Sequence, residues 1–351
     1  MKYVDFPAIQ KNFEYFWNHE YFGRCALRLT APIKPVSSLI INNYEDMIKE
    51  WCDGETRLKR NRTLSENTYY LGEAFPLFFI NLGAAGNAGY FKNIKYEFTK
   101  DTLWFFPINN NDELIFSKDS FLYKSTIDLA KYFADNANGE FILGMPGCSS
   151  NIDALAHLRG TEQLLMNLID NPEKVKEDLK AVQKSWFEIV NDVYRIISKN
   201  YYGGSATWLG TYAKGFHSQL QSDISVMLSP DQFDDFVLED LQLQSEILEY
   251  PCYHLDGQEQ ILHLDKLLSI KNLRLIQYTF CAGQPTPAEQ IPVLKRIQKS
   301  GKLLLLFLEP KYVKPILENL SAKNLFINTS CRNPDEADQI FKIVQDYSKE
   351  R

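Results

Sequence analysis

The sequence predicts an α/β protein built as a (β/α)8 barrel, and three observations support this fold class. Short apolar runs alternate with helical patterns throughout the 351 residues. Runs such as Leu303–Leu308 are continuously apolar, which is typical of parallel strands buried on both faces. Several helices begin with a capping residue followed by proline. A closed barrel is the simplest architecture for eight such alternations, and an open, doubly wound sheet is the alternative.

Eight apolar runs have the length and turn signals expected of barrel strands. We expect these strands at Leu77–Leu82, Phe141–Gly144, Ser205–Leu209, Leu220–Ile224, Cys252–Leu255, Leu273–Tyr278, Leu303–Leu308 and Leu325–Thr329. The third and fourth runs are the weakest and are also compatible with loops.

Helix starts are signalled more clearly than the strands. Ser229–Gln232, Thr286–Glu289 and Asn333–Glu336 each place a capping residue, a proline and a Gln or Glu in the first helical turn. Asn171 precedes Pro172 in the same manner. Arg159 lies in a helical segment, where we expect it to form a buried salt bridge.

The first 75 residues do not fit a plain barrel. They contain the helical stretches Phe6–Trp17 and Tyr44–Arg62 and a strand-like segment at Cys25–Thr30. We interpret residues 1–75 as a mainly helical N-terminal extension that covers one end of the barrel, within a single domain of residues 1–351.

Composition excludes several classes of partner. The net charge of −7 argues against nucleic acids and anionic membranes, because both require clustered Lys and Arg. No apolar run reaches 18 residues, and Met1–Gln10 lacks the pattern of a secretory signal. The six cysteines are widely spaced and form no CxxC motif. We therefore expect a cytoplasmic protein with reduced thiols that acts on a small-molecule substrate.

Candidate catalytic residues follow the predicted strands, because the active face of a barrel lies at the carboxyl ends of its strands. His254 and Asp256 are two residues apart and therefore point to the same side of an extended chain. Glu309 and Cys331 follow the last two strands. His254, Asp256 and Cys331 are a plausible set of zinc ligands, and we assign catalytic roles to His254, Asp256 and Glu309.

Other polar or aromatic residues near strand ends are candidates for substrate binding. These are Asn81, Trp208, Gln221, Asp223, Gln277 and Tyr278. Two further interpretations of the centre stay open. His254 and Asp256 can act as a metal-free acid–base pair, or as a hydrogen-bonded dyad with a purely structural role, with Cys331 as a small buried hydrophobe.

These residues belong to a wider pattern of sequence similarity. From about Phe141 onward, the chain resembles the uroporphyrinogen decarboxylase superfamily, and upstream segments resemble a branch labelled trimethylamine-corrinoid-type protein. The similar segments are Gly72–Pro76, Asn81–Gly83, Asp101–Phe105, Leu158–Glu162, Asp170–Val175, Ser222–Phe233, Tyr253–Gly257 and Ile297–Lys302. The resemblance implies a barrel fold and a relation to cobalamin-dependent methyltransferases.

The resemblance also implies a zinc site, with one departure from the family pattern. The methyltransferases are similar in carrying His-x-Cys at one strand end and a further Cys near the last strand. His254 and Cys331 match the outer positions, whereas Asp256 replaces the middle cysteine. The decarboxylases bind their polycarboxylated substrate through an Arg-x-x-Gly-Arg type segment, which this sequence lacks, so true uroporphyrinogen decarboxylation is not expected.

Three functions are therefore compatible with the sequence. The leading one is a methyltransferase, with zinc as cofactor, that moves a methyl group between a corrinoid on a partner protein and a small acceptor. A metal-free lyase, decarboxylase or hydrolase that uses His254 and Asp256 is the second. A non-catalytic binder of a corrinoid or tetrapyrrole is the third, and a homodimer is possible for all of them.

Overall fold

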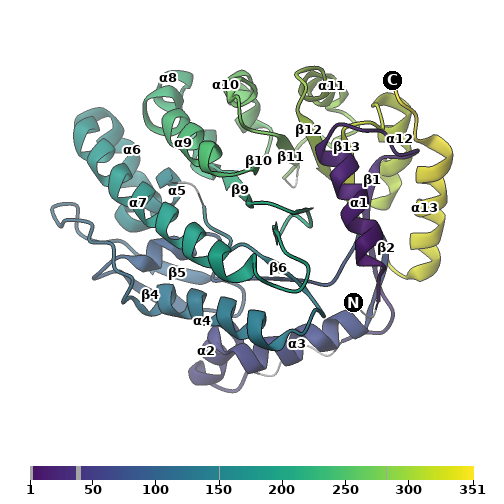
Figure 1. Ribbon diagram of the computed structural model, residues 1–351. Coiled ribbons are helices and arrows are strands. Elements are labelled where there is room, and N and C mark those ends of the chain that lie inside the picture. Colours follow the sequence, from purple (N-terminus) through teal and green to yellow (C-terminus); the bar gives the residue numbers. More distant parts are fainter. Residues whose placement is uncertain (1–2, 37–40, 150, 282) are drawn as a thin grey trace.

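The computed structural model describes residues 3–36, 41–149, 151–281 and 283–351. Helices surround a group of strands, and the N-terminal elements lie beside the C-terminal ones (Figure 1). Within the described residues, no helix has the length and apolar character needed to cross a membrane.

Most strands belong to a seven-stranded sheet with the order β2-β1-β13-β12-β11-β10-β9. All its neighbours are parallel except β1 and β2. Its strands are β1 (Ala26–Pro32), β2 (Thr68–Gly72), β9 (His217–Gln221), β10 (Tyr250–Asp256), β11 (Leu275–Thr279), β12 (Leu303–Phe307) and β13 (Leu325–Ser330).

A smaller sheet has the order β3-β6-β7-β8. Its strands are β3 (Leu77–Phe79), β6 (Ile142–Gly144), β7 (Ser205–Ala206) and β8 (Tyr212–Ala213). Strands β3, β6 and β7 are parallel, and β8 folds back antiparallel on β7. A separate hairpin consists of β4 (Lys95–Phe98) and β5 (Leu103–Phe106).

A side-chain contact joins β7 of the smaller sheet to β9 of the larger sheet, between which no described strand ladder forms. The Ser205 hydroxyl accepts a hydrogen bond from the backbone N–H of His217 and donates one to its carbonyl, at 2.9 and 3.0 Å. Within the larger sheet, the fully buried Glu73 carboxylate directly after β2 accepts from the Leu27 backbone N–H of β1 at 2.7 Å and forms an ion pair with Arg24 at 2.6 Å.

Helices cover the outer faces of the sheets (Figure 1). The α-helices are α1 (Phe6–Trp17), α2 (Tyr44–Cys52), α3 (Gly54–Glu66), α4 (Phe121–Asn136), α5 (Asn151–Arg159), α6 (Thr161–Asp170), α7 (Pro172–Ile197), α8 (Pro230–Phe233), α9 (Glu239–Ile247), α10 (Leu264–Ser269), α11 (Ile291–Lys299), α12 (Pro310–Asn319) and α13 (Pro334–Tyr347). Short turns of other helix types are η1 (Gly86–Tyr90), η2 (Asp223–Met227), η3 (Asp234–Leu238) and η4 (Glu259–His263).

Helix α1 buries one face against residues of both sheets. Its buried aromatic side chains share a core cluster with residues from both sheets, among them Ile142, Cys252 and Phe326. The Trp17 indole N–H donates to the Tyr212 carbonyl at 2.8 Å. The two sheets and the buried face of α1 therefore share one apolar core cluster.

The mixed α/β class with a mostly parallel sheet is confirmed. Among the described strands no ladder joins the two sheets, so closure into an eight-stranded barrel is not confirmed. The predicted strand at Cys25–Thr30 does not lie in an outer extension, because β1 pairs with β13 in the central sheet. Asp53 divides the predicted helix Tyr44–Arg62 into α2 and α3.

The helix-start predictions have mixed outcomes. Ser229 forms the predicted capping box, Asn333 caps α13 through the Glu336 N–H, and α7 begins at Pro172. The prediction at Thr286 is wrong. Its backbone N–H and hydroxyl both bind the Glu289 carboxylate at 2.8 Å, which stabilises a turn, and α11 begins only at Ile291.

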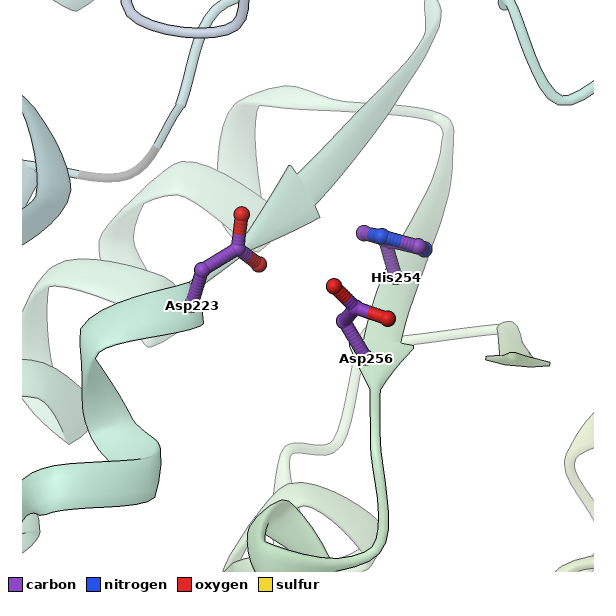
Figure 2. Close-up of side chains that lie close together, drawn as sticks. All are labelled: Asp223, His254 and Asp256. Carbon is purple, nitrogen blue, oxygen red and sulfur yellow. The ribbon is translucent and has the colours of Figure 1, made fainter. Parts of the chain in front are cut away.

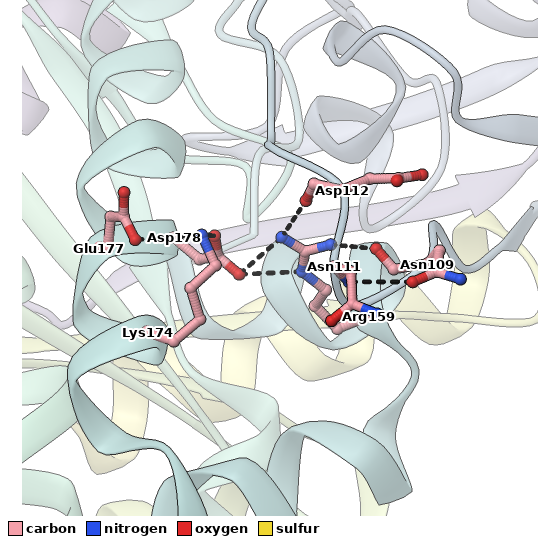
Figure 3. A network of polar contacts seen from close by, with 7 residues as sticks. All are labelled: Asn109, Asn111, Asp112, Arg159, Lys174, Glu177 and Asp178. Atoms are coloured by element: carbon pink, nitrogen blue, oxygen red, sulfur yellow. Dashed lines mark hydrogen bonds and ion pairs between the residues drawn. The ribbon is translucent and has the colours of Figure 1, made fainter.

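The predicted buried salt bridge of Arg159 is confirmed (Figure 3). Arg159 and Asp178 lie 2.8 Å apart, and both side chains are almost completely buried. The guanidinium also donates to the carbonyls of Asn109 and Asp112 at 2.7 and 2.9 Å, and Lys174 contacts Asp178 from the opposite side at 3.2 Å. Arg159 thus links α5, α7 and the loop that follows β5.

Candidate functional site

Three side chains converge at the carboxyl ends of β9 and β10 (Figure 2). His254 and Asp256 lie on β10, and Asp223 is the first residue of η2, directly after β9. Each residue offers one potential ligand atom, and these atoms all lie within 4.8 Å of one another. The two β10 residues face the same side because strand side chains alternate.

Neighbouring groups fix the orientation of the His254 imidazole. Its ring lies edge-on to Trp208 at a centroid distance of 5.0 Å, and only 7% of the residue is exposed. The Nδ1 atom is hydrogen-bonded to Oε1 of Gln277, which lies opposite His254 on β11. An amide oxygen only accepts, so Nδ1 carries the proton and Nε2 is the atom free to bind a metal or move a proton.

Backbone and side-chain contacts hold Asp223 in place. The Asp153 carboxylate on α5 accepts the backbone N–H groups of Asp223 and Ile224, both at 2.9 Å. The Gln221 amide donates to the Asp223 carboxylate at 3.1 Å. Burial raises the pKa of Asp223; His254 opposes this increase, and the Asp256 carboxylate adds to it.

A sulfur atom adjoins the same cluster. Cys281 is an exposed residue in the loop after β11, and its thiol lies 3.6 Å from Oδ1 of Asp256. Burial and the nearby Asp256 raise the pKa of this thiol.

A cavity of about 570 Å³ lies next to His254. Trp208 lines this cavity, and its ring is in edge-on contact with the His254 ring. Its lining also includes Thr279, the register partner of Asp256, and Phe307, whose ring lies 6.2 Å from Trp208. A cavity of this size accommodates a small organic molecule. The candidate site therefore combines a polar centre with an adjoining pocket.

Arg28 supplies positive charge to this cavity from the inward face of β1. Its guanidinium donates to the side-chain oxygen of Asn328 at 3.1 Å, and no described carboxylate forms an ion pair with it. Burial lowers the pKa of Arg28. Gly210 makes room for this side chain, because a Cβ there would lie 2.4 Å from the Arg28 Cδ atom.

The structure places some predicted site residues at this centre and others elsewhere. Trp208 lines the cavity, and Gln221 and Gln277 contact members of the cluster. Glu309 lies on the cavity rim and forms an exposed ion pair with Lys311 at 2.8 Å.

Cys331, predicted as a metal ligand, is not part of the three-residue cluster. It belongs to the same apolar core cluster as Leu325 and Ile327, which we call the outer core. These two residues lie on the same side of β13 because strand side chains alternate. The inward positions of that strand are Phe326 and Asn328. Burial raises the pKa of the Cys331 thiol to about 11, as expected for a cysteine packed among apolar groups.

Two predicted substrate-binding residues also lie elsewhere. Tyr278 is fully buried in the outer core, and its side chain points to the opposite face of β11 from that of its neighbour Gln277. Asn81 lines a separate cavity, and its side-chain oxygen accepts the Gly83 N–H at 3.0 Å.

Sequence reasoning missed Arg28, Asp153 and Cys281 as contributors to the site. For Arg28 the sequence did contain a signal, which is strand alternation. Leu27 and Leu29 on either side of it point outward, so Arg28 points inward. Asp153 acts through backbone contacts between segments far apart in sequence, which no local pattern reveals.

The cluster fits a divalent metal ion. Two carboxylates and one imidazole are common ligands of zinc, whose bonds of about 2.0–2.2 Å place ligand atoms roughly 3.4 Å apart. The present spacing of at most 4.8 Å therefore needs only small side-chain movements. Oδ1 of Asp223 is buried and has no hydrogen-bond partner in the described structure, and a cation would satisfy it.

Comparison with known proteins gives a likeness in fold. No protein-family model matches the chain, and no curated protein matches it in sequence. Among solved structures, a methyltransferase from Methanosarcina mazei superposes with a TM-score of 0.60. The match covers 96% of this chain and 98% of the other at 9% sequence identity. The chain therefore shares the fold of a methyltransferase over almost its full length.

Proposed function

We propose that this protein is a methyltransferase of the uroporphyrinogen decarboxylase superfamily, with a zinc ion held by Asp223, His254 and Asp256. The observation that carries this proposal is the convergence of their ligand atoms beside an open cavity. This ligand set keeps His254 and Asp256 from the sequence prediction and replaces Cys331 with Asp223. The full-length likeness to a methyltransferase fold supports the assignment.

The fold assignment within this proposal is an opened (β/α)8 barrel. The two sheets share one interior core, and the Ser205 side chain joins β7 of one sheet to β9 of the other. A superfamily relation accounts for both the shared interior and the position of the candidate site at the strand ends.

The cavity favours a small anionic methyl acceptor. Arg28 is the cation that lines it without a carboxylate partner, and a desolvated guanidinium binds carboxylate, sulfonate or phosphate groups strongly. Phe307 and Trp208 provide apolar walls for the body of the molecule. We propose an acidic thiol as acceptor and a methylated corrinoid on a partner protein as donor.

In this reaction the acceptor thiol loses its proton to solvent, and its sulfur forms a bond to the methyl carbon. The methyl–cobalt bond breaks, and both electrons stay with the corrinoid. When bound, zinc would stabilise the acceptor thiolate. Arg28 would hold the acidic end of the acceptor, while Gln277 keeps the His254 ring in the tautomer that leaves Nε2 free.

Metal analysis tests the proposed centre. Purified protein reconstituted with zinc and freed of excess metal should retain about one equivalent per chain by elemental analysis. His254→Ala and Asp223→Asn should each lose it, and Cys331→Ser, changed outside the cluster, should keep it. Zinc that is absent from the wild type, or lost only on changing Cys331, would refute this ligand set.

Activity tests the reaction class. With methylcobalamin as donor and mercaptoacid acceptors, the zinc-loaded protein should produce a methyl thioether, detected by mass spectrometry. Arg28→Gln should raise the KM for the acidic acceptor by about 10- to 100-fold, equivalent to the loss of about 1.5–3 kcal/mol from a charged hydrogen bond. It should leave the KM for a neutral thiol unchanged. Equal effects on both acceptors would contradict the role of Arg28.

A second function is favoured by the raised pKa of Asp223. A buried carboxyl group whose pKa is raised, beside an imidazole, is suited to general acid–base catalysis. In that case the protein is a metal-free lyase, decarboxylase or hydrolase of an anionic substrate. Activity that survives complete chelation of zinc would favour this function over methyl transfer.

A further inference from the structure

A second cavity, of about 440 Å³, lies away from the candidate site. Helices α2 and α3, the segment after β3 and the turn between β4 and β5 enclose it. Its polar lining consists of Glu50, Arg57, Arg60, Asn61, Asn81, Lys100 and Asp101. Three of these side chains are cationic, and the cavity shares no lining residue with the one at Arg28.

One face of α3 supplies most of the positive charge. Arg57, Arg60 and Asn61 are separated by three and four positions, so they lie on the same side of the helix. Lys100 approaches from the β4–β5 turn. Like charges placed together repel each other, and a bound anion would relieve this repulsion.

Arg57 is the least exposed of the three cations and has few compensating contacts. One guanidinium nitrogen donates to the Glu50 carbonyl at 3.3 Å, while Nε is buried and has no hydrogen-bond partner among the described residues. The group lies over the Phe78 ring at 5.6 Å. Burial, followed by the charge of Arg60, lowers the pKa of Arg57 to about 10.

The carboxylates of the cavity do not balance these cations. Glu50 forms a long ion pair with Arg60 at 3.5 Å, and no described carboxylate forms an ion pair with Arg57 or Lys100. Asp101 is exposed. A buried guanidinium without a carboxylate is costly unless a ligand completes its contacts.

We propose that this cavity binds a small phosphate-bearing molecule through Arg57, Arg60 and Lys100. A phosphate group has enough oxygen atoms to accept hydrogen bonds from two guanidinium groups and an ammonium group together. The Trp51 and Leu64 side chains in the lining contact the organic part of the molecule. This site is independent of the metal centre and of the proposed methyl transfer.

Titration calorimetry with inorganic phosphate, phenyl phosphate and phenol tests this proposal. Phenyl phosphate should bind with a Kd at or below about 1 mM, more tightly than inorganic phosphate, and phenol should not bind. Arg57→Gln and Arg60→Gln should each weaken phenyl phosphate binding at least about 10-fold, consistent with the loss of a charge-assisted contact. Lack of phenyl phosphate binding to the wild type would refute the site.

Two control variants locate the binding. Arg195→Gln changes an exposed arginine on α7 and should bind phenyl phosphate as the wild type does. Arg28→Gln removes the cation of the other cavity, so the binding that this variant retains belongs to the site at Arg57. Loss of binding in Arg28→Gln would place the ligand at the candidate active site and overturn the proposal. Unchanged binding in both Arg57→Gln and Arg60→Gln would also overturn it.

Thermal unfolding separates a ligand-binding role of Arg57 from a structural one. Without phosphate, Arg57→Gln should unfold at the same temperature as the wild type or higher, because an uncompensated charge is removed. Phenyl phosphate should raise the unfolding temperature of the wild type and of Arg195→Gln but not that of Arg57→Gln. If Arg57→Gln does not fold, the exposed Arg60→Gln decides the outcome.

Discussion

His254 and Gln277 lie directly opposite each other on adjacent parallel strands, and the imidazole Nδ1–H donates to the amide oxygen. Gln277 is completely buried, so this partner is shielded from water. The register of β10 and β11 therefore determines which imidazole nitrogen is presented to Asp223 and Asp256. The tautomer of the candidate ligand is set by strand pairing.

Replacing Gln277 tests this dependence. Gln277→Leu removes the acceptor for Nδ1–H, and we expect the affinity for zinc to fall about 10- to 100-fold, as for other partners of metal-bound histidines. Competition with a zinc chelator measures the change. Gln277→Glu keeps an acceptor and should retain affinity within about 10-fold. Equal losses in both variants would mean that Gln277 acts through packing alone.

Strand alternation predicted part of this site from the sequence. The same rule that places His254 and Asp256 together also places Cys331 on the opposite face from Phe326 and Asn328. Applying it to β13 would have separated Cys331 from the other candidates. Asp223 could not be assigned a role in this way, because its position depends on the contact of Asp153 with a distant turn.

Cysteine reactivity should reflect these different positions. In the folded, metal-free protein, iodoacetamide should modify Cys281 first, because it is exposed, whereas Cys331 is buried. The raised pKa of Cys281 should make its reaction slower than that of a free cysteine at the same pH. Peptide mapping over time measures both rates. Faster modification of Cys331 would contradict the packing of β13.

A second consequence concerns the metal centre. An alkyl group on Cys281 would occupy space beside Asp256 and should weaken zinc binding. Cys281→Ser, treated with iodoacetamide in parallel, should bind zinc equally well before and after treatment. Weakening in this variant as well would show that another modified cysteine is responsible.

The fold was predictable where local sequence decides the structure. The continuously apolar Leu303–Leu308 is a buried parallel strand, and Ser229 and Asn333 cap helices as predicted. Pairing between distant strands was not predictable, so the place of β1 beside β13 was missed. The short β7 also follows from a long-range contact, the hydrogen bonds between the Ser205 side chain and His217.

The buried ion pair of Arg159 and Asp178 should contribute strongly to stability. Arg159→Met leaves a buried carboxylate whose remaining cation, Lys174, is partly exposed, and it frees the carbonyls of Asn109 and Asp112. We expect the free energy of unfolding to fall by about 3–5 kcal/mol. Denaturant unfolding measures the change.

A double variant separates the charge from the other contacts. Arg159→Met combined with Asp178→Asn should recover part of the loss, because no buried charge is left unpaired. The remaining deficit reports the lost hydrogen bonds to the loop. Equal stability of the single and double variants would show that the Asp178 charge is compensated by Lys174 alone.

Asp240 on α9 should make stability depend on pH. Burial raises the pKa of this carboxyl group to about 6, with Asn151 opposing the shift and Glu239 adding to it. One carboxylate oxygen is buried without a hydrogen-bond partner in the described structure. The folded protein binds this proton more tightly than the unfolded chain, whose pKa is about 3.8. Stability therefore falls as pH rises from about 4 through 6.

Asp240→Asn removes this titration and keeps the shape of the side chain. Above pH 6 the variant should be more stable than the wild type by about 1–3 kcal/mol, the equivalent of a shift of one to two pKa units. The difference should shrink on acidification and vanish near pH 4, where both states of the wild type hold the proton. Denaturant unfolding across this range measures it. Asp346→Asn, an exposed change on α13, should show no such pH-dependent gain, and a constant difference for Asp240→Asn would show that its effect is not electrostatic.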